Sequence, residues 1–291
     1  MNKILITGAT GHLGTSVVDE IIRRNGTKNV SVLARDLSKA GKLKEKGVNL
    51  IHGDYNDYNS LLKAFKGIDK LYFVSGSDIF KRSSQHENVV NAAKAAKVGH
   101  IIYTSFQRKT DDDTSPIALL VFAHVLAEKL IRESGLTYTI MKHAPYSDGV
   151  PVFIGDKVFN SGVIFLPAGN GKASYASRKD MASAGVEVLL GEGHENKTYE
   201  ISADKSYTFY EIAAILTELS GKQIHYAAPD VETFSTALLK SGIPKETIQA
   251  LSTFCMAIAR GEFDFPDNTL EKLIGRKPES LKDFLKNTYR L

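Results

Sequence analysis

The chain has 291 residues, of which 43% are hydrophobic and 24% charged, and its formal net charge is +4 at pH 7. This composition excludes a disordered or fibrous protein and suits one large α/β domain, or a nucleotide-binding domain with a smaller appendage. Lys and Arg residues are spread along the chain and not gathered in a block, which argues against direct nucleic-acid binding.

Signals of secretion and of membrane insertion are missing from the sequence. Met1-Asn2-Lys3 leads directly into a short apolar run, unlike a signal peptide, and no apolar stretch approaches the length of a membrane span. The single cysteine, Cys255, cannot form an internal disulfide and lies among apolar neighbours, which favours a buried structural thiol in a reducing compartment. We therefore expect a soluble, cytoplasmic protein with no membrane partner.

Short apolar runs alternate with amphipathic stretches over the first half of the chain. The apolar runs predict six strands, at 3–7, 29–34, 48–52, 69–75, 99–105 and 136–142, and helical spacing predicts helices at 12–25, 59–65, 87–97 and 117–134. Continuous apolar runs are typical of parallel strands that are covered on both faces. The pattern predicts an α/β fold, a Rossmann-type doubly wound parallel sheet with the strand order 3-2-1-4-5-6.

The alternation stops after residue 143. Residues 145–170 are rich in Gly, Pro and aromatic residues, with weak strand signals. A helix at about 178–190 and a strand at 198–202 are expected to return to the main sheet, and helices dominate from 209 onward. We expect a Rossmann domain over residues 1–143, joined by 178–203, and a small, mostly helical substrate-binding lobe made of 144–177 and 204–291.

A glycine-rich loop follows the first predicted strand and opens the first predicted helix. Gly8 allows a tight turn, Gly11 lets the backbone approach a pyrophosphate, and Gly14 lets the helix pack close to the strand. Backbone N–H groups and the positive end of the helix dipole then face the phosphates. The spacing is Gly-x-x-Gly-x-x-Gly, which differs from the usual Gly-x-Gly-x-x-Gly. The strand–turn–helix context nevertheless predicts a dinucleotide site made by Gly8, Thr10, Gly11, His12, Leu13 and Gly14.

The end of the second strand discriminates between NADP and NAD. Arg35 stands where NAD enzymes carry an acid for the ribose 2′-hydroxyl, and an arginine there accommodates a 2′-phosphate. The sequence favours NADP, with NADPH as the reductant. Asp36, the next residue, keeps NAD possible, and Arg35 could instead be a surface cation on a loop.

Two further strand ends supply cofactor-binding candidates. Asp54 and Tyr55 follow the third strand, where a short acid can accept a hydrogen bond from the adenine amino group. The small residues Ser75 and Gly76 follow the fourth strand and leave room for the cofactor to cross the sheet edge. The alternative for both segments is an ordinary strand-to-loop turn.

The ends of the fifth and sixth strands point to the reaction site, because ligands of doubly wound sheets lie beyond the carboxyl ends of the strands. Thr104 supplies a hydroxyl there, and His143 and Tyr146 are expected to line the nicotinamide and substrate. Tyr146 offers a flat face and a hydroxyl to a planar substrate, as a catalytic candidate, although a packed linker tyrosine is an equal alternative.

Five stretches of this sequence carry a family resemblance: residues 7–14, 52–55, 135–139, 193–199 and 273–278. Together they resemble the NmrA-like branch of the atypical short-chain dehydrogenases/reductases, and within it the bacterial NAD(P)H:quinone oxidoreductases of the second type and triphenylmethane reductase. The glycine loop alone is common to the whole superfamily, whereas the later stretches are more specific. The resemblance covers essentially the whole chain.

The resemblance implies an unusual catalytic apparatus. The superfamily's Tyr-x-x-x-Lys pair is absent from the helix where it should lie, and His124 falls there at the place where related reductases have the lysine. His124 is therefore a catalytic candidate that could bond to the ribose, the nicotinamide or a substrate oxygen, or supply a proton near neutral pH. The alternative is a satisfied histidine at a helix–sheet contact. Lys142-His143 departs from the Leu-Arg-Asn of related proteins, so no role is carried over there by resemblance.

The function implied is hydride transfer from NADPH to a quinone or a similar flat conjugated acceptor, a small-molecule substrate. Such a transfer needs little acid catalysis, because the oxygen that gains charge becomes a weakly basic phenolate. The alternative is a non-catalytic NAD(P)-binding redox sensor of the NmrA type, acting through a protein partner. No metal site is expected, since the acids at 111–113 have no His or Cys beside them. A homodimer is one candidate for the oligomeric state.

Overall fold

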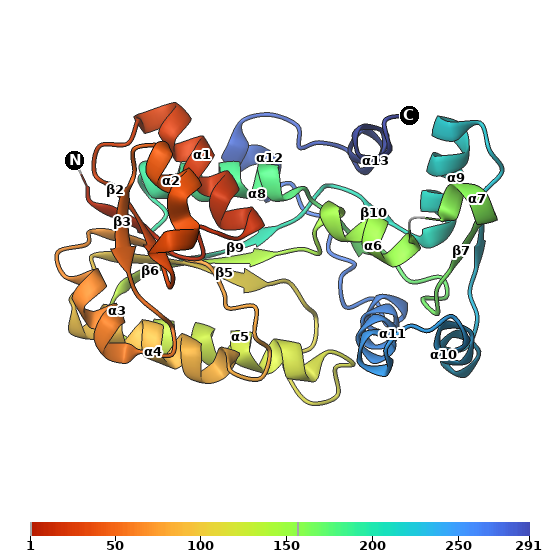
Figure 1. The fold of residues 1–291 in the computed structure, drawn as a ribbon, viewed down its shortest axis with the longest axis horizontal. Coiled ribbons are helices and arrows are strands. Elements are labelled where there is room, and N and C mark those ends of the chain that lie inside the picture. Colours follow the sequence, from red (N-terminus) through yellow and green to blue (C-terminus); the bar gives the residue numbers. More distant parts are fainter. Residues whose placement is uncertain (1, 156) are drawn as a thin grey trace.

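A seven-stranded parallel sheet forms the centre of the molecule, which a computed structural model describes over residues 2–155 and 157–291 (Figure 1). The strand order is β3-β2-β1-β4-β5-β6-β9, which confirms the expected order and adds the returning strand beside β6. Strands inside the sheet are almost completely buried, whereas the edge strand β3 is partly exposed. The strands are β1 (Ile4–Ile6), β2 (Val30–Ala34), β3 (Asn49–His52), β4 (Lys70–Phe73), β5 (His100–Phe106), β6 (Thr137–His143) and β9 (Lys197–Ile201).

Helices cover both faces of this sheet, as a doubly wound fold requires (Figure 1). One face packs against α1 (His12–Asn25), α2 (Gly41–Glu45), α8 (Arg178–Leu190) and α12 (Thr269–Ile274). The other packs against α3 (Tyr58–Phe65), α4 (Arg82–Ala95) and α5 (Ala118–Glu133). Short 3-10 turns follow β2 and β6, at η1 (Leu37–Ala40) and η2 (Ser147–Gly149). The Rossmann-type fold expected from the sequence is therefore confirmed.

A second group of elements lies beyond the carboxyl edge of the sheet and encloses its own hydrophobic cluster (Figure 1). Its helices are α6 (Val150–Ile154), α7 (Val158–Ser161), α9 (Phe209–Ser220), α10 (Val231–Lys240), α11 (Lys245–Ala259) and α13 (Leu281–Tyr289). Two small strand pairs join them: β7 (Val163–Phe165) with β11 (His225–Ala227), and β8 (Ala173–Ser174) with β10 (Ser206–Tyr207). Near the C-terminus, α12 packs on α8 and β9 of the main sheet, while α13 packs on α9. The assignment of a separate substrate-binding role to this lobe stays a prediction.

A buried carboxylate joins the lobe to the sheet. Glu262, which follows α11 and is 4% exposed, accepts hydrogen bonds from the backbone N–H groups of Lys109 and Thr110, at 3.1 and 3.0 Å. These two residues lie in the loop after β5. The loop and the lobe are thereby held together at the edge of the sheet where ligands of this fold bind.

Two further expectations from the sequence concern the single cysteine and membrane-spanning helices. Cys255 is completely buried in the cluster of the lobe, and burial raises the pKa of its thiol to about 12, as expected of a structural cysteine. Within the described part of the chain, none of the helices combines the length and apolar character needed to cross a bilayer.

Candidate functional site

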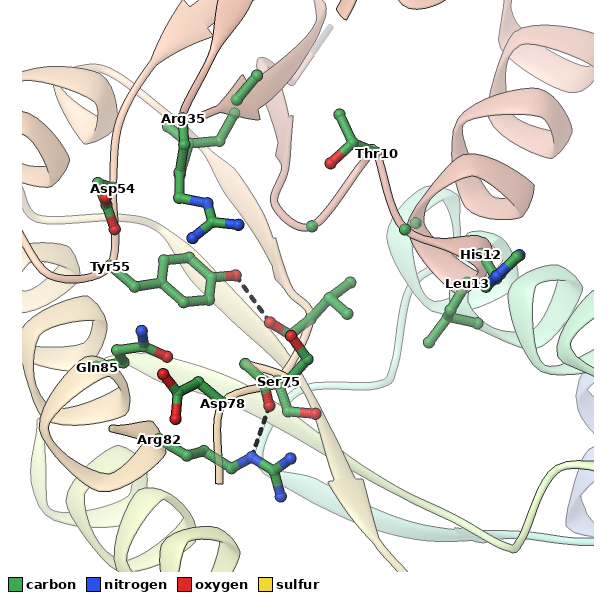
Figure 2. Close-up of a pocket in the computed structure, with 18 of the residues that line it drawn as sticks. Thr10, His12, Leu13, Arg35, Asp54, Tyr55, Ser75, Asp78, Arg82 and Gln85 are labelled. Carbon is green, nitrogen blue, oxygen red and sulfur yellow. Dashed lines mark hydrogen bonds between the residues drawn. The ribbon is translucent and has the colours of Figure 1, made fainter. Parts of the chain in front are cut away.

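A cleft of about 520 Å³ runs along the carboxyl ends of β1, β2, β3 and β4 (Figure 2). The glycine loop forms one wall, and the segments after β2, β3 and β4 form the opposite one. The start of α4, with Tyr146 and Arg178, closes one end. Twelve of the fifteen residues singled out in the sequence line this cleft: Gly8, Thr10, Gly11, His12, Leu13, Gly14, Arg35, Asp54, Tyr55, Ser75, Gly76 and Tyr146.

Close backbone packing explains the glycines of the loop. A Cβ at Gly14 would lie 2.2 Å from the carbonyl oxygen of Gly8, so α1 could not approach the loop with any other residue there. Gly8 itself has φ +61°, and a Cβ on it would lie 2.9 Å from the Cβ of Val74. Two of the three glycines are thus required by the contact between the loop, α1 and β4.

The N-terminus of α1 opens into the cleft without a compensating side chain. Its N-cap residue, Gly11, cannot supply a side-chain cap, and the first turn contains no acid. The unsatisfied N–H groups and the positive end of the helix dipole are therefore left to an external anion. The geometry fits a pyrophosphate.

Arg35, Asp54 and Tyr55 gather at one end of the cleft (Figure 2). The Tyr55 hydroxyl lies 2.7 Å from the carbonyl oxygen of Val74 and also bonds to the Thr7 hydroxyl, which fixes the ring as part of the cleft wall. Arg35 is exposed, and its guanidinium is directed toward this ring in Figure 2. A cation in this position suits a phosphate attached to the adenosine end of a dinucleotide.

Tyr146 and Arg178 occupy the opposite end. A bridge between Tyr146 and Ala176 brings the start of α8 beside the segment after β6, and the guanidinium carbon of Arg178 lies 4.3 Å from the centre of the Tyr146 ring. Asp148 holds Arg178 through an ion pair of 3.1 Å. Burial raises the pKa of Tyr146 to about 12, so its hydroxyl keeps its proton at neutral pH and can donate a hydrogen bond.

Sequence reasoning missed the cations and the amide that α4 and α8 bring to the cleft, which are Lys81, Arg82, Gln85 and Arg178. Their positions depend on where the helices begin and how these rotate against the sheet. No signal for Arg82 was available in the sequence, because the predicted helix begins at residue 87 whereas α4 begins at Arg82.

Thr104 and His86 lie behind the cleft and hold its wall. The Thr104 hydroxyl accepts a hydrogen bond from the backbone N–H of Ser75 at 3.0 Å, and Nε2 of His86 accepts one from Gly76 at 3.1 Å. Thr104 is therefore not among the residues that line the cleft, and His86 was not foreseen from the sequence. Together they fix the turn after β4.

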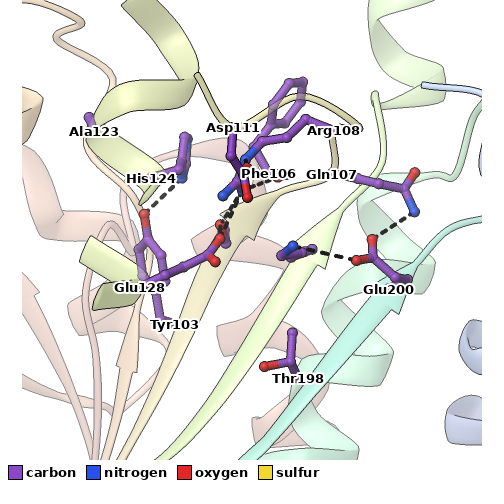
Figure 3. Close-up of polar contacts among 12 residues, drawn as sticks. Tyr103, Phe106, Gln107, Arg108, Asp111, Ala123, His124, Glu128, Thr198 and Glu200 are labelled. Atoms are coloured by element: carbon purple, nitrogen blue, oxygen red, sulfur yellow. Dashed lines mark hydrogen bonds and ion pairs between the residues drawn. The ribbon is translucent and has the colours of Figure 1, made fainter. Parts of the chain in front are cut away.

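His124 and His143 are also buried outside the cleft lining. Nδ1 of His124 lies 2.7 Å from the Tyr103 hydroxyl (Figure 3), and burial places the pKa of His124 well below its usual value. His143 is 1% exposed with neither ring nitrogen hydrogen-bonded among the described residues, and burial lowers its pKa to about 3. Both imidazoles are neutral at pH 7, so they can act as hydrogen-bonding groups but not as cationic acids.

A buried ion pair lies beside these histidines, at the carboxyl end of β5 (Figure 3). Nη1 of Arg108 is 2.8 Å from Oε1 of Glu128 on α5, and its Nε is 2.6 Å from the exposed Asp111. The side chains of Arg108 and Glu128 are almost completely buried. This ion pair fixes the start of the loop after β5, the same loop whose backbone N–H groups bond to Glu262.

A doubly wound parallel sheet, a glycine loop before the first helix and a cleft along the strand ends together define a dinucleotide-binding protein of the Rossmann type. The chain belongs to the NmrA-like family, whose sequence model matches residues 1–289.

Two relatives show how close this similarity is. The chain is 34% identical over 288 residues to quinone oxidoreductase 2 of Escherichia coli (strain K12), covering 99% of each. A crystal structure of NADPH-dependent quinone oxidoreductase from E. coli, complexed with NADPH, matches with a TM-score of 0.89, over 98% of this chain and 99% of that one. Triphenylmethane reductase from Citrobacter sp., complexed with NADP(H), is 35% identical with a TM-score of 0.90, over 98% and 99% of the two chains.

Proposed function

We propose that this protein is an NADPH-dependent oxidoreductase that transfers a hydride to a quinone or a similar flat conjugated acceptor. The observation that carries this proposal is the continuous cleft from Arg35, past the open N-terminus of α1, to Tyr146 and Arg178. It offers an anion site at each place where NADPH carries phosphate. The E. coli and Citrobacter relatives are named as reductases that use this cofactor.

Each part of the cofactor has a complementary part of the cleft. Arg35 would receive the 2′-phosphate, with Asp54 and Tyr55 beside the adenosine. The glycine loop and the first turn of α1 would hold the pyrophosphate, and the small residues Ser75 and Gly76 would let the second ribose pass. The nicotinamide would then lie toward Tyr146, where it supplies the hydride when bound.

Aromatic side chains of Phe106 at the end of β5 and of the lobe, which lie outside the lining of the cleft, would provide the acceptor site. The ring centres of Phe254 and Phe263 are 4.8 Å apart, those of Phe153 and Phe254 are 5.1 Å apart, and Phe106 lies 5.5 Å from Phe263. Flat conjugated molecules stack favourably on aromatic rings, and Phe106, Phe153 and Phe254 are only partly buried, whereas Phe263 behind them is fully buried. Tyr146 would donate a hydrogen bond to the acceptor.

His124 would act from the wall of the acceptor site as a neutral imidazole. Its ring centre is 6.0 Å from that of Phe106, and Tyr103 occupies its Nδ1. Nε2 of His86 accepts from Gly76, so its Nδ1 carries the proton and cannot accept from the Tyr103 hydroxyl. That hydroxyl therefore donates to Nδ1 of His124, and Nε2 of His124 carries the proton and is the atom available to a ligand. We propose a positioning role for His124 in place of proton donation.

Oxidation of NADPH in the presence of different acceptors tests the proposal. We expect turnover with 1,4-benzoquinone and larger quinones, weaker turnover with NADH as the reductant, and none with simple aldehydes. If bound NADPH is oxidised by no member of a panel of quinones and dyes, while a pull-down captures a transcription factor, the redox-sensor alternative is correct. A cytoplasmic location and a homodimer are part of the proposal; light scattering measures the latter.

A further inference from the structure

Arg82 is a buried cation on the floor of the cleft. The residue is 7% exposed, its Nε donates a hydrogen bond of 2.6 Å to the carbonyl oxygen of Gly76, and its Nη1 is buried with no hydrogen-bond partner among the described residues. Figure 2 shows the side chain crossing the cleft floor, with the terminal nitrogens directed away from α4. A guanidinium has five N–H donors, and donors left unsatisfied in an interior are costly.

The charge of Arg82 is compensated only at a distance, by the carboxylate of Asp78. Within residues 2–155 and 157–291 it forms no ion pair at 4.0 Å or less. Asp78 is nearby, but its Oδ1 accepts from the backbone N–H groups of Phe80 and Lys81, at 3.1 and 3.2 Å. Arg82 also begins α4, where the helix dipole is positive, and burial lowers its pKa. An external anion would satisfy the unpaired N–H donors of the buried Arg82 and would offset both its charge and the positive end of the α4 dipole.

The position of Arg82 indicates which anion this is. Arg82 bonds to Gly76 after β4, and the strand order puts β4 between β1, which leads into the glycine loop, and β6, which leads to Tyr146. Arg82 therefore lies on the acceptor side of the glycine loop, and its charge acts on both Tyr146 and His124. The proposed phosphate sites, at Arg35 and the start of α1, have their own positive charge.

We propose that the guanidinium of Arg82 donates a hydrogen bond to the acceptor oxygen that becomes negative during reduction. This inference rests on the proposed function. A quinone that takes a hydride, one hydrogen with two electrons, from reduced NADPH becomes the hydroquinone monoanion, and NADP⁺ remains. A proton from water then gives the hydroquinone. Arg82 keeps its own proton throughout and takes the electrostatic part that the absent tyrosine acid plays elsewhere in the superfamily.

The proposal distinguishes two classes of acceptor. A quinone oxygen gains negative charge as the hydride arrives, so Arg82 stabilises the transition state more than the ground state. A cationic triphenylmethane dye takes the hydride at its central carbon and becomes neutral, so no oxyanion forms that could accept a hydrogen bond from Arg82. Arg82→Met is therefore expected to slow quinone reduction much more than dye reduction.

Steady-state kinetics of Arg82→Met test this difference, with the surface variant Arg23→Met as the control for loss of an arginine. We expect kcat for 1,4-benzoquinone to fall roughly 10- to 100-fold, as for loss of a hydrogen bond to a charged group. Reduction of crystal violet and the Kd of NADPH, from fluorescence titration, should stay within about threefold. Arg82→Lys keeps the charge but loses the planar guanidinium with its several N–H donors, and it should give an intermediate rate of quinone reduction. This variant replaces Arg82→Met if Arg82→Met does not fold.

A binding measurement provides a readout without turnover. 4-Nitrophenol absorbs visibly only as the phenolate, so titration of the protein–NADP⁺ complex gives the pKa of the bound phenol. We expect this pKa to be lower in the wild type than in Arg82→Met, and guanidinium chloride to restore part of the lost quinone rate to Arg82→Ala.

Three results would overturn the inference: an equal fall for quinone and dye, a matching loss of NADPH affinity, or an unchanged 4-nitrophenol titration. The second result would make Arg82 a cofactor ligand. If the wild type reduces no quinone but Arg82→Met still shifts the 4-nitrophenol titration, the proposed function fails and the anion site stands.

Discussion

The contact between Gly14 and the carbonyl oxygen of Gly8 gives a sharp test of the cleft. In Gly14→Ala the new Cβ would lie 2.2 Å from that oxygen, about 1.2 Å short of the 3.4 Å at which ordinary contact begins. The neighbouring atoms are backbone, so α1 must move as a unit. Overpacking of this kind costs about 1–3 kcal/mol of folding free energy. Displacing the N–H groups of the α1 start by about 1 Å should weaken NADPH binding roughly 100-fold.

Gly11→Ala and Gly41→Ala form a graded control series. A Cβ at Gly11 would lie 3.3 Å from the same oxygen, whereas one at Gly41, which has φ −52° at the start of α2, meets nothing within 4 Å. In urea denaturation, we expect the free energy of unfolding to be lowest for Gly14→Ala, higher for Gly11→Ala and highest for Gly41→Ala. The free energy of unfolding of Gly41→Ala should exceed that of the wild type by about 0.4–1 kcal/mol. Calorimetry gives the NADPH affinity. The reasoning is wrong if Gly14→Ala matches Gly41→Ala in both stability and affinity.

Three further predictions follow from the same structure. Arg35→Ser should raise the KM for NADPH roughly 10- to 100-fold and leave that for NADH nearly unchanged, because a charge-assisted bond to the 2′-phosphate is lost; equal effects on both cofactors would contradict this. Glu128→Leu leaves the Arg108 guanidinium buried beside an exposed acid and should cost about 3–5 kcal/mol in urea unfolding, most of it recovered in the double variant with Arg108→Met; no recovery would refute the pairing. Burial, aided by the charge of Lys70, lowers the pKa of His100 to about 4, whereas an unfolded histidine titrates near 6.5. The unfolded state alone takes up this proton as the pH falls from about 6.5 to 4, so stability should fall in that window, and His100→Asn should reduce the slope by up to about 1.4 kcal/mol per pH unit.

The sheet and the glycine loop could be predicted because the sequence encodes both locally. Continuous apolar runs such as Ile4–Ile6 are buried on both sides, and this dictates parallel strands covered by helices. Parallel strands also bring their carboxyl ends to one edge, so Arg35, Asp54 and Ser75 could be expected around one cleft without any knowledge of their contacts.

The sequence could not show which side chains line the cleft and which are buried behind its lining. His124 was expected at a reaction site because it falls where related reductases place a lysine, but the rotation of α5 directs it onto Tyr103, behind the lining of the cleft. Arg178 reaches Tyr146 only through the bridge at Ala176, which joins segments some thirty residues apart. Such positions follow from tertiary packing, which spacing along the chain does not record.

The bond between Glu262 and the loop after β5 has a consequence for redesign of the acceptor range. The carboxylate holds two main-chain N–H groups, so its grip does not depend on which side chains Lys109 and Thr110 carry. Substitutions at these two positions should therefore be tolerated. Insertions or deletions would shift the two N–H groups out of register with the carboxylate and leave it buried and unsatisfied. A library that diversifies this loop at constant length should consequently yield more folded variants than one that varies its length.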